Sequence, residues 1–197
     1  MPERLSALMH DKLDHGQIAS NNWLGTWSRG PILRGPLLRG AALATAVGVA
    51  YYLAAYLSLG LLMKPDGVAV FWPAAGISSG VLIALGPKAR WPVAFGAIAA
   101  TLVANLMGDR TVWAASAFAI CNAAEALMTA GLIQRYGGSA FRLDRLRHVL
   151  LLFAAAVAGT VVSGIGGAIS YKLFHSPDVP MFTTWWHWFG SDAVGIV

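Results

Sequence analysis

Two carboxylates lie inside apolar stretches of this sequence, where an ionisable group is costly to insert into a membrane. Glu125 has Asn122 three residues before it and Thr129 four after it, so the three side chains share one face of a helix. Asp192 follows the tryptophan-rich segment 185–188 and begins an otherwise apolar run. Charged groups retained at membrane depth usually bind a ligand, carry protons or pair with a polar neighbour. Glu125 and Asp192 are therefore the first candidates for functional side chains.

The composition points to a membrane protein. Of the 197 residues, 57% are hydrophobic and 12% are charged, whereas a soluble domain carries about 25% charged residues. The apolar residues also come in blocks of about 20, the length that spans a hydrocarbon core. We predict an all-α, polytopic helical membrane bundle with about six spans, the last of them truncated at the chain end. The predicted spans are 40–63, 68–86, 91–108, 112–134, 147–171 and 180–197.

Several other classes of protein are excluded or disfavoured. Cys121 is the one cysteine, so a secreted disulfide framework is excluded. The net charge of +5 does not indicate nucleic-acid binding, because the basic residues flank apolar runs. His10 and Asp14 have helical i, i+4 spacing, but no further ligands cluster with them, so we predict no metal site. No motif indicates a catalytic site or a particular cofactor.

The distribution of Lys and Arg predicts the orientation. Inside segments collect positive charge, and with a cytoplasmic N-terminus 11 of the 14 basic residues lie inside, leaving Lys64, Arg110 and Lys172 outside. We therefore expect residues 1–35 to be a cytoplasmic tail and 36–197 to be a transmembrane domain that is incomplete at its C-terminus.

Small residues at four-residue spacing predict close helix contacts, because small side chains let helix backbones approach each other in lipid. Gly40, Ala44 and Gly48 form one such stripe, and Gly76 and Gly80 form a second. We assign Ser163 to a third packing stripe and to no chemistry.

The polar candidates have alternative roles. Glu125 could serve only as a hydrogen-bonding contact between helices, or it could face a ligand or proton site in the bundle interior. Asp192 either pairs with a hydrogen-bond donor on a neighbouring helix or lines an outer, water-accessible cavity near Trp72 and Trp188. Asn105 is expected to be a helix-packing amide, and segment 109–110 a solvated turn. The tryptophans of segment 185–188 are expected to form an interfacial aromatic belt.

Five motifs in order resemble a known family. They are "FWPAAGI" (71–77), Asn105, "NAAEAL" (122–127) with "RYGG" (135–138), "RLDRLRHVLLL" (142–152) and "WHWFGSDAVGI" (186–196). Together, over roughly residues 65–197, they resemble the membrane-associated sensor domain of the first type (MASE type one). The resemblance implies these ligand-binding or signalling residues: Trp72, Pro73, Asn105, Asn122, Glu125, Trp188 and Asp192.

The resemblance also implies a function. It indicates a non-catalytic sensory module in the bacterial inner membrane, joined through further spans beyond Val197 to a histidine kinase or a diguanylate cyclase. The expected partners are the lipid bilayer, an unidentified small-molecule or protein stimulus and a second copy in a homodimer, with no nucleic acid. The alternative is a small transport component, such as the substrate-binding subunit of a vitamin uptake system, in which the Pro73 motif would break a helix.

Overall fold

The computed structural model describes residues 35–63, 67–138 and 141–197. Within these ranges the chain forms six α-helices: α3 (Pro36–Leu59), α4 (Pro73–Leu85), α5 (Arg90–Met107), α6 (Val112–Gly137), α7 (Leu146–Phe174) and α8 (Met181–Ile196). A short 3₁₀ helix, η1 (Pro87–Ala89), precedes α5. The described residues contain no β-strand, and the nearest approach to one is an isolated bridge between Leu62 and Ala69. The predicted all-α fold is confirmed.

The chain divides into two units, Met1–Arg39 and Gly40–Val197. The first is described only from Gly35, whose carbonyl accepts a 3.2 Å hydrogen bond from the backbone N–H of Arg39 in the first turn of α3. The predicted cytoplasmic tail, with His10 and Asp14, otherwise falls outside the described residues. The arrangement described below is that of the second unit.

Four of the described helices are long and apolar enough to cross a membrane: α3, η1 with α5, α6 and α7. The predicted span 68–86 needs correction. Residues 68–72 are not helical: α4 begins only at Pro73 and contains 13 residues. At 1.5 Å per residue α4 is about 20 Å long, shorter than the hydrocarbon core of about 30 Å. Helix α8, with 16 residues, matches the predicted segment 180–197 to within one residue at each end.

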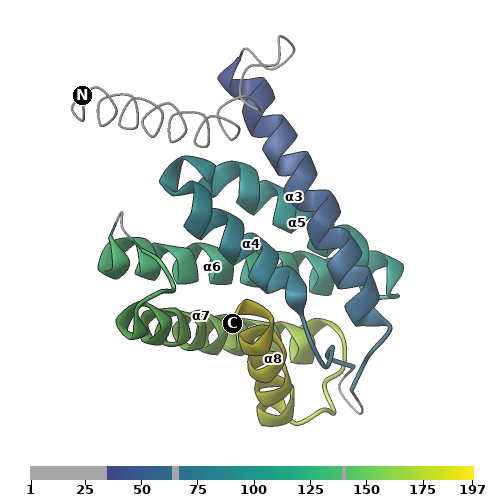
Figure 1. Cartoon of the computed structure of the whole chain (residues 1–197). Helices are drawn as coiled ribbons and strands as arrows, with labels where there is room; N and C mark the ends of the chain where they lie inside the picture. Colours follow the sequence, from purple (N-terminus) through teal and green to yellow (C-terminus); the bar gives the residue numbers. More distant parts are fainter. Residues whose placement is uncertain (1–34, 64–66, 139–140) are drawn as a thin grey trace, which may run out of the picture. The chain divides into compact units, whose positions relative to one another are not determined.

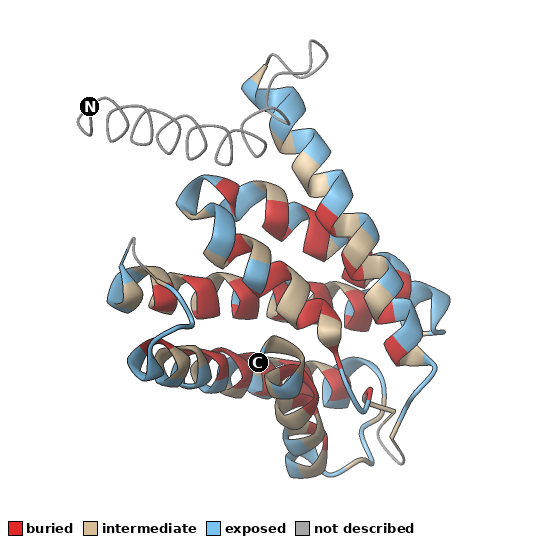
Figure 2. Ribbon diagram, viewed as in Figure 1, coloured by how far each residue is buried: buried red, intermediate tan, exposed pale blue. Residues whose placement is uncertain are grey.

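Helix α6 lies at the centre of the packing. It contacts α4, α5 and α7, while α8 contacts α4 and α7. In Figure 1, α6 and α7 run side by side and α8 lies across α7. Buried positions recur along α6 and on the inward faces of its neighbours, and exposed positions cover the outward faces (Figure 2). A polar side chain on α6 can therefore face several helices at once.

Helices meet closely where residues are small. A Cβ added at Gly76 on α4 would lie 2.1 Å from the carbonyl oxygen of Gly195 on α8. A Cβ at Gly96 on α5 would lie 2.5 Å from the carbonyl oxygen of Ala44 on α3. The predicted small-residue contacts are thus confirmed at Ala44 and Gly76. A Cβ at Gly80 would meet nothing within 4 Å, so the prediction is wrong there.

Local sequence signals explain where the helices around the site begin. Pro73 occupies the first turn of α4, where its missing N–H leaves no intrahelical bond unmade and its fixed φ favours the helix. Thr111 caps α6 by accepting a 3.2 Å hydrogen bond from the backbone N–H of Ala114. The non-helical segment 67–72 and the turn at 108–111 therefore lie next to helix ends, and both contribute to the site.

Candidate functional site

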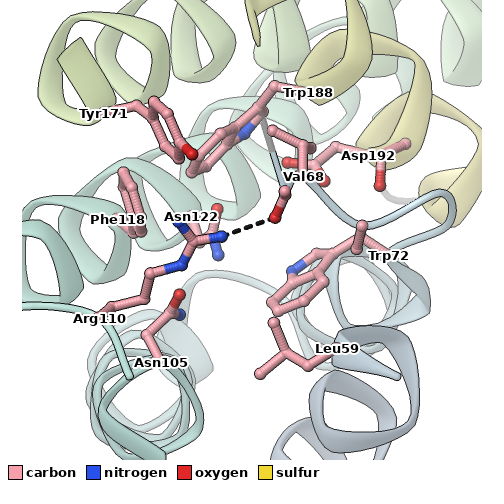
Figure 3. A pocket seen from close by; sticks show the side chains of 13 residues that line it. Leu59, Val68, Trp72, Asn105, Arg110, Phe118, Asn122, Tyr171, Trp188 and Asp192 are labelled. Atoms are coloured by element: carbon pink, nitrogen blue, oxygen red, sulfur yellow. Dashed lines mark hydrogen bonds between the residues drawn. The ribbon is translucent and has the colours of Figure 1, made fainter. Parts of the chain in front are cut away.

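A pocket lies where α3, α5 and α7 end and where α4 and α6 begin, with α8 beside it. Thirteen residues line it: Leu59, Gly67, Val68, Ala69, Trp72, Asn105, Arg110, Phe118, Asn122, Tyr171, Trp188, Ser191 and Asp192. In Figure 3, Asn105, Arg110, Phe118 and Asn122 lie on one side, with Trp72 and Asp192 on the other. Segments from across the sequence therefore form one site.

The pocket brings together most of the residues singled out from the sequence. Trp72, Asn105, Asn122, Trp188 and Asp192 all line it. Of the other two, Pro73 follows Trp72 directly at the start of α4 and is not among the residues that line the pocket. Glu125 is fully buried behind the pocket wall.

Glu125 and Asp192 form a buried acidic pair. Glu125 is 2% exposed and Asp192 is 4% exposed, and their carboxyl groups interact directly although they come from α6 and α8. On the other side of Glu125, the hydroxyl of Ser163 on α7 donates a hydrogen bond to Oε2. The assignment of Ser163 to packing alone is therefore wrong. The pair links α6, α7 and α8 at one point.

Four buried polar atoms on the pocket wall have no hydrogen-bond partner among the described residues: Asn122 Oδ1, Trp188 Nε1, Ser191 Oγ and Asp192 Oδ2. Buried polar atoms are nearly always hydrogen-bonded, so each exception requires an explanation. Here all four lie around one cavity. The arrangement fits a site whose polar groups are satisfied by water or by a ligand.

The position of Arg110 differs from the prediction that segment 109–110 is a solvated turn. Asp109 is exposed, as expected of a turn, but Arg110 is half-buried and reaches into the pocket. Its Nη2 donates a 2.6 Å hydrogen bond to the carbonyl oxygen of Gly67, and its guanidinium carbon lies 5.2 Å from the centre of the Tyr171 ring (Figure 3). Partial burial, with the nearby charge of Arg110, lowers the pKa of His175 below its ordinary value. Arg110 thus supplies the pocket with a positive charge.

Aromatic side chains form another part of the wall. The ring of Phe118 packs edge-on against Trp188 at 5.0 Å and stacks with Tyr171 at 6.4 Å between centres. Trp188 is 8% exposed because it lies against Gly167 of α7, where an added Cβ would come within 2.7 Å of its ring. Trp188 is therefore not part of an interfacial belt, whereas Trp186 remains 55% exposed.

Helix α3 also supports the site. The hydroxyl of Tyr51, which is fully buried, accepts a 3.1 Å hydrogen bond from Trp72 Nε1. Asn105 Nδ2 donates a 2.9 Å bond to the carbonyl of Thr101 one turn earlier in α5, so this amide has a structural role as well as a place on the pocket wall. Sequence reasoning missed Tyr51, although a tyrosine in the middle of an apolar span needs a partner for its hydroxyl. It missed Arg110 because a charge beside a turn usually faces water.

The pocket is narrow. Its cavity volume is about 40 Å³, which is room for a few water molecules. A few waters or a small molecule fit without rearrangement. Among the described residues, no group of three His, Cys, Asp or Glu side chains converges as a metal site.

These features define a multi-pass helical membrane protein with a polar pocket enclosed by its helices. The MASE1 family profile matches residues 42–197, and the chain belongs to this family of membrane sensory, non-catalytic domains. No curated protein shows a significant match to the chain, and no solved structure does. The family match favours the sensory interpretation over the transport component considered from the sequence.

Proposed function

We propose that this chain is the input domain of a bacterial signal-transduction protein, acting on a histidine kinase or a diguanylate cyclase from the inner membrane. The observation that carries the proposal is the pocket itself, because a MASE1 domain here encloses polar groups that its own described side chains leave unsatisfied. Large apolar side chains such as Leu57, Phe95 and Ile120 are exposed on the helices, which suits contact with a lipid bilayer.

The position of the pocket suggests how a stimulus would act. A ligand shifts a conformational equilibrium only if it binds two packings of the bundle unequally. The pocket wall joins α6, α7 and α8, and the acidic pair behind it connects the same three helices. A ligand that contacts Asp192 therefore favours one packing of α8 against α6 and α7, and the movement of these helices passes to the output domain.

The proposed orientation places the pocket toward the outer face. With a cytoplasmic N-terminus, α3, α5 and α7 end outside, and the pocket lies at these ends. Reporter enzymes fused after residue 66 and after residue 176 are expected to be active outside the cytoplasm. Cytoplasmic activity at both positions would overturn the orientation and move the pocket to the inner face.

Two observations test the signalling role. Sequencing the gene past the codon for Val197 is expected to show a kinase or cyclase output domain. In the full-length protein, Asp192→Asn is expected to change the output response, whereas Asp178→Asn, at an exposed aspartate before α8, is expected to leave it unchanged. If Asp192→Asn, Asp192→Leu and Glu125→Leu all leave the response unchanged, the pocket does not sense the stimulus.

A further inference from the structure

We propose that the pocket binds a small zwitterion of the glycine or alanine type, with its ammonium group at Asp192 and its carboxylate at Arg110. This inference rests on the proposed sensory function and names the ligand class for the same pocket. It is argued from the charges, burial and unsatisfied atoms of the wall.

The acidic end of the pocket suits an ammonium group. Asp192 Oδ2 and Asn122 Oδ1 are buried acceptors without partners among the described residues, and both line the pocket. The carboxyl group of Glu125 interacts with Asp192 from behind the wall. The two carboxyl groups are joined by a hydrogen bond through one shared proton, so the pair carries one negative charge that an ammonium group at Asp192 would compensate. An ammonium group brings three donors and one positive charge.

The opposite side suits a carboxylate. Arg110 lies across the pocket from Asp192 (Figure 3), and no described carboxylate lies within ion-pair distance of its guanidinium. One of its donors is occupied by the Gly67 carbonyl, and the guanidinium fork has five donors in total. The remaining donors can bind a carboxylate, which arginine recognises in a planar, two-pronged geometry.

Charge balance favours a zwitterion over a simple ion. An amine alone would leave Arg110 without a counter-ion in the part of the chain that is described, and a carboxylate alone would leave the negative charge of the Glu125–Asp192 pair without one. Partly buried charges are costly unless they are paired. A molecule with both charges compensates both ends in one binding event. The volume of about 40 Å³ and the rings of Trp72 and Phe118 restrict such a ligand to a small side chain.

The test uses the full chain in lipid nanodiscs, with L-alanine, propionate and ethylamine as probes. Propionate is alanine without its amine, and ethylamine is alanine without its carboxylate. Calorimetric titration is expected to show saturable binding of L-alanine that is at least about tenfold tighter than that of either analogue, the size expected for loss of one charged hydrogen-bonded contact. Glycine is expected to bind in the same way.

Variants test which residue binds the carboxylate of alanine and which binds its ammonium group. Arg110→Gln is expected to remove the advantage of alanine over ethylamine, and Asp192→Asn its advantage over propionate. Lys172→Gln and Asp178→Asn change exposed charges nearby and are expected to bind alanine as the unaltered chain does. Because Arg110→Gln could unfold the chain, Arg110→Lys provides a second test: it keeps the charge but not the fork, and should bind alanine with intermediate affinity.

The outcomes separate the ligand class from the sensory role. If alanine binds no better than propionate or ethylamine, or if both site variants bind it unchanged, the zwitterion assignment is wrong. In that case an Asp192→Asn variant that still alters output would leave the proposed function standing. Alanine could instead bind as described while the output of the full-length protein changes neither on adding alanine nor in the Asp192→Asn variant. That result would support the ligand class and contradict the sensory function.

Discussion

Trp72 and Tyr51 join two segments of the chain across the edge of the pocket: the indole Nε1 of Trp72 donates a 3.1 Å hydrogen bond to the phenol oxygen of Tyr51. Their rings meet edge-to-face, with centres 6.4 Å apart. Both side chains are buried. The contact ties α3 to the segment before α4, and so fixes one wall of the pocket from a helix that contributes little else to the lining.

Replacing Tyr51 by Phe is expected to lower the free energy of unfolding by about 1–3 kcal/mol, because the indole N–H is left buried without an acceptor. Chemical denaturation in detergent micelles measures the change. Tyr52→Phe is the matched control, since the hydroxyl of Tyr52 bonds Met107 Sδ at an exposed position and should cost less than about 0.5 kcal/mol. Equal losses in the two variants would show that the Trp72 bond contributes no stability.

Ser163→Ala is expected to destabilise the bundle by about 1–3 kcal/mol, because Glu125 loses its hydroxyl donor on α7. Ser170→Ala on the same helix removes only a bond to the carbonyl of Gly166 one turn earlier, and its effect should be smaller. A double-mutant cycle with Glu125→Leu, which removes the acceptor, measures the coupling between the two side chains. A coupling energy near zero would contradict the interhelical bond.

Gly76→Ala is expected to destabilise the protein by more than about 1 kcal/mol, since the new methyl group would run into the backbone of Gly195. Gly80 lies one turn further along α4, and a Cβ there would meet nothing within 4 Å. Gly80→Ala should therefore be neutral or stabilising by up to about 1 kcal/mol through helix propensity. Thermal unfolding of both variants checks the contrast, and a loss at Gly80 as large as that at Gly76 would argue against the close crossing of α4 and α8.

Arg110→Gln is expected to raise the pKa of His175 toward its ordinary value, because a neighbouring positive charge that disfavours the protonated ring is removed. The contribution from partial burial remains, so the shift will be incomplete. An NMR titration of labelled histidines measures it, with His187 on α8 as the internal reference. In the unaltered chain the lowered pKa means that stability falls as the pH decreases below about 6.5, and this loss should be smaller in the variant.

The sequence by itself predicted the all-α membrane fold and singled out several residues that line the candidate pocket. Continuous apolar blocks of about 20 residues favour helices in lipid, because a helix satisfies every backbone polar group within its own segment, whereas barrel strands are shorter and alternate in polarity. Glu125, Asn122 and Asp192 stood out for a related reason: polar side chains at membrane depth are costly and rarely incidental. These conclusions depend on local composition and helical spacing, which can be read along one chain.

Tertiary structure alone decided which of these residues meet. The interaction of Glu125 with Asp192, the Ser163 donor, the Tyr51 partner of Trp72 and the inward position of Arg110 all join side chains far apart in sequence. Helical periodicity gives the face on which a residue lies but not the helix that packs against that face. That choice depends on which backbones can approach closely, as at Gly76 and Gly195, where any side chain would separate α4 from α8.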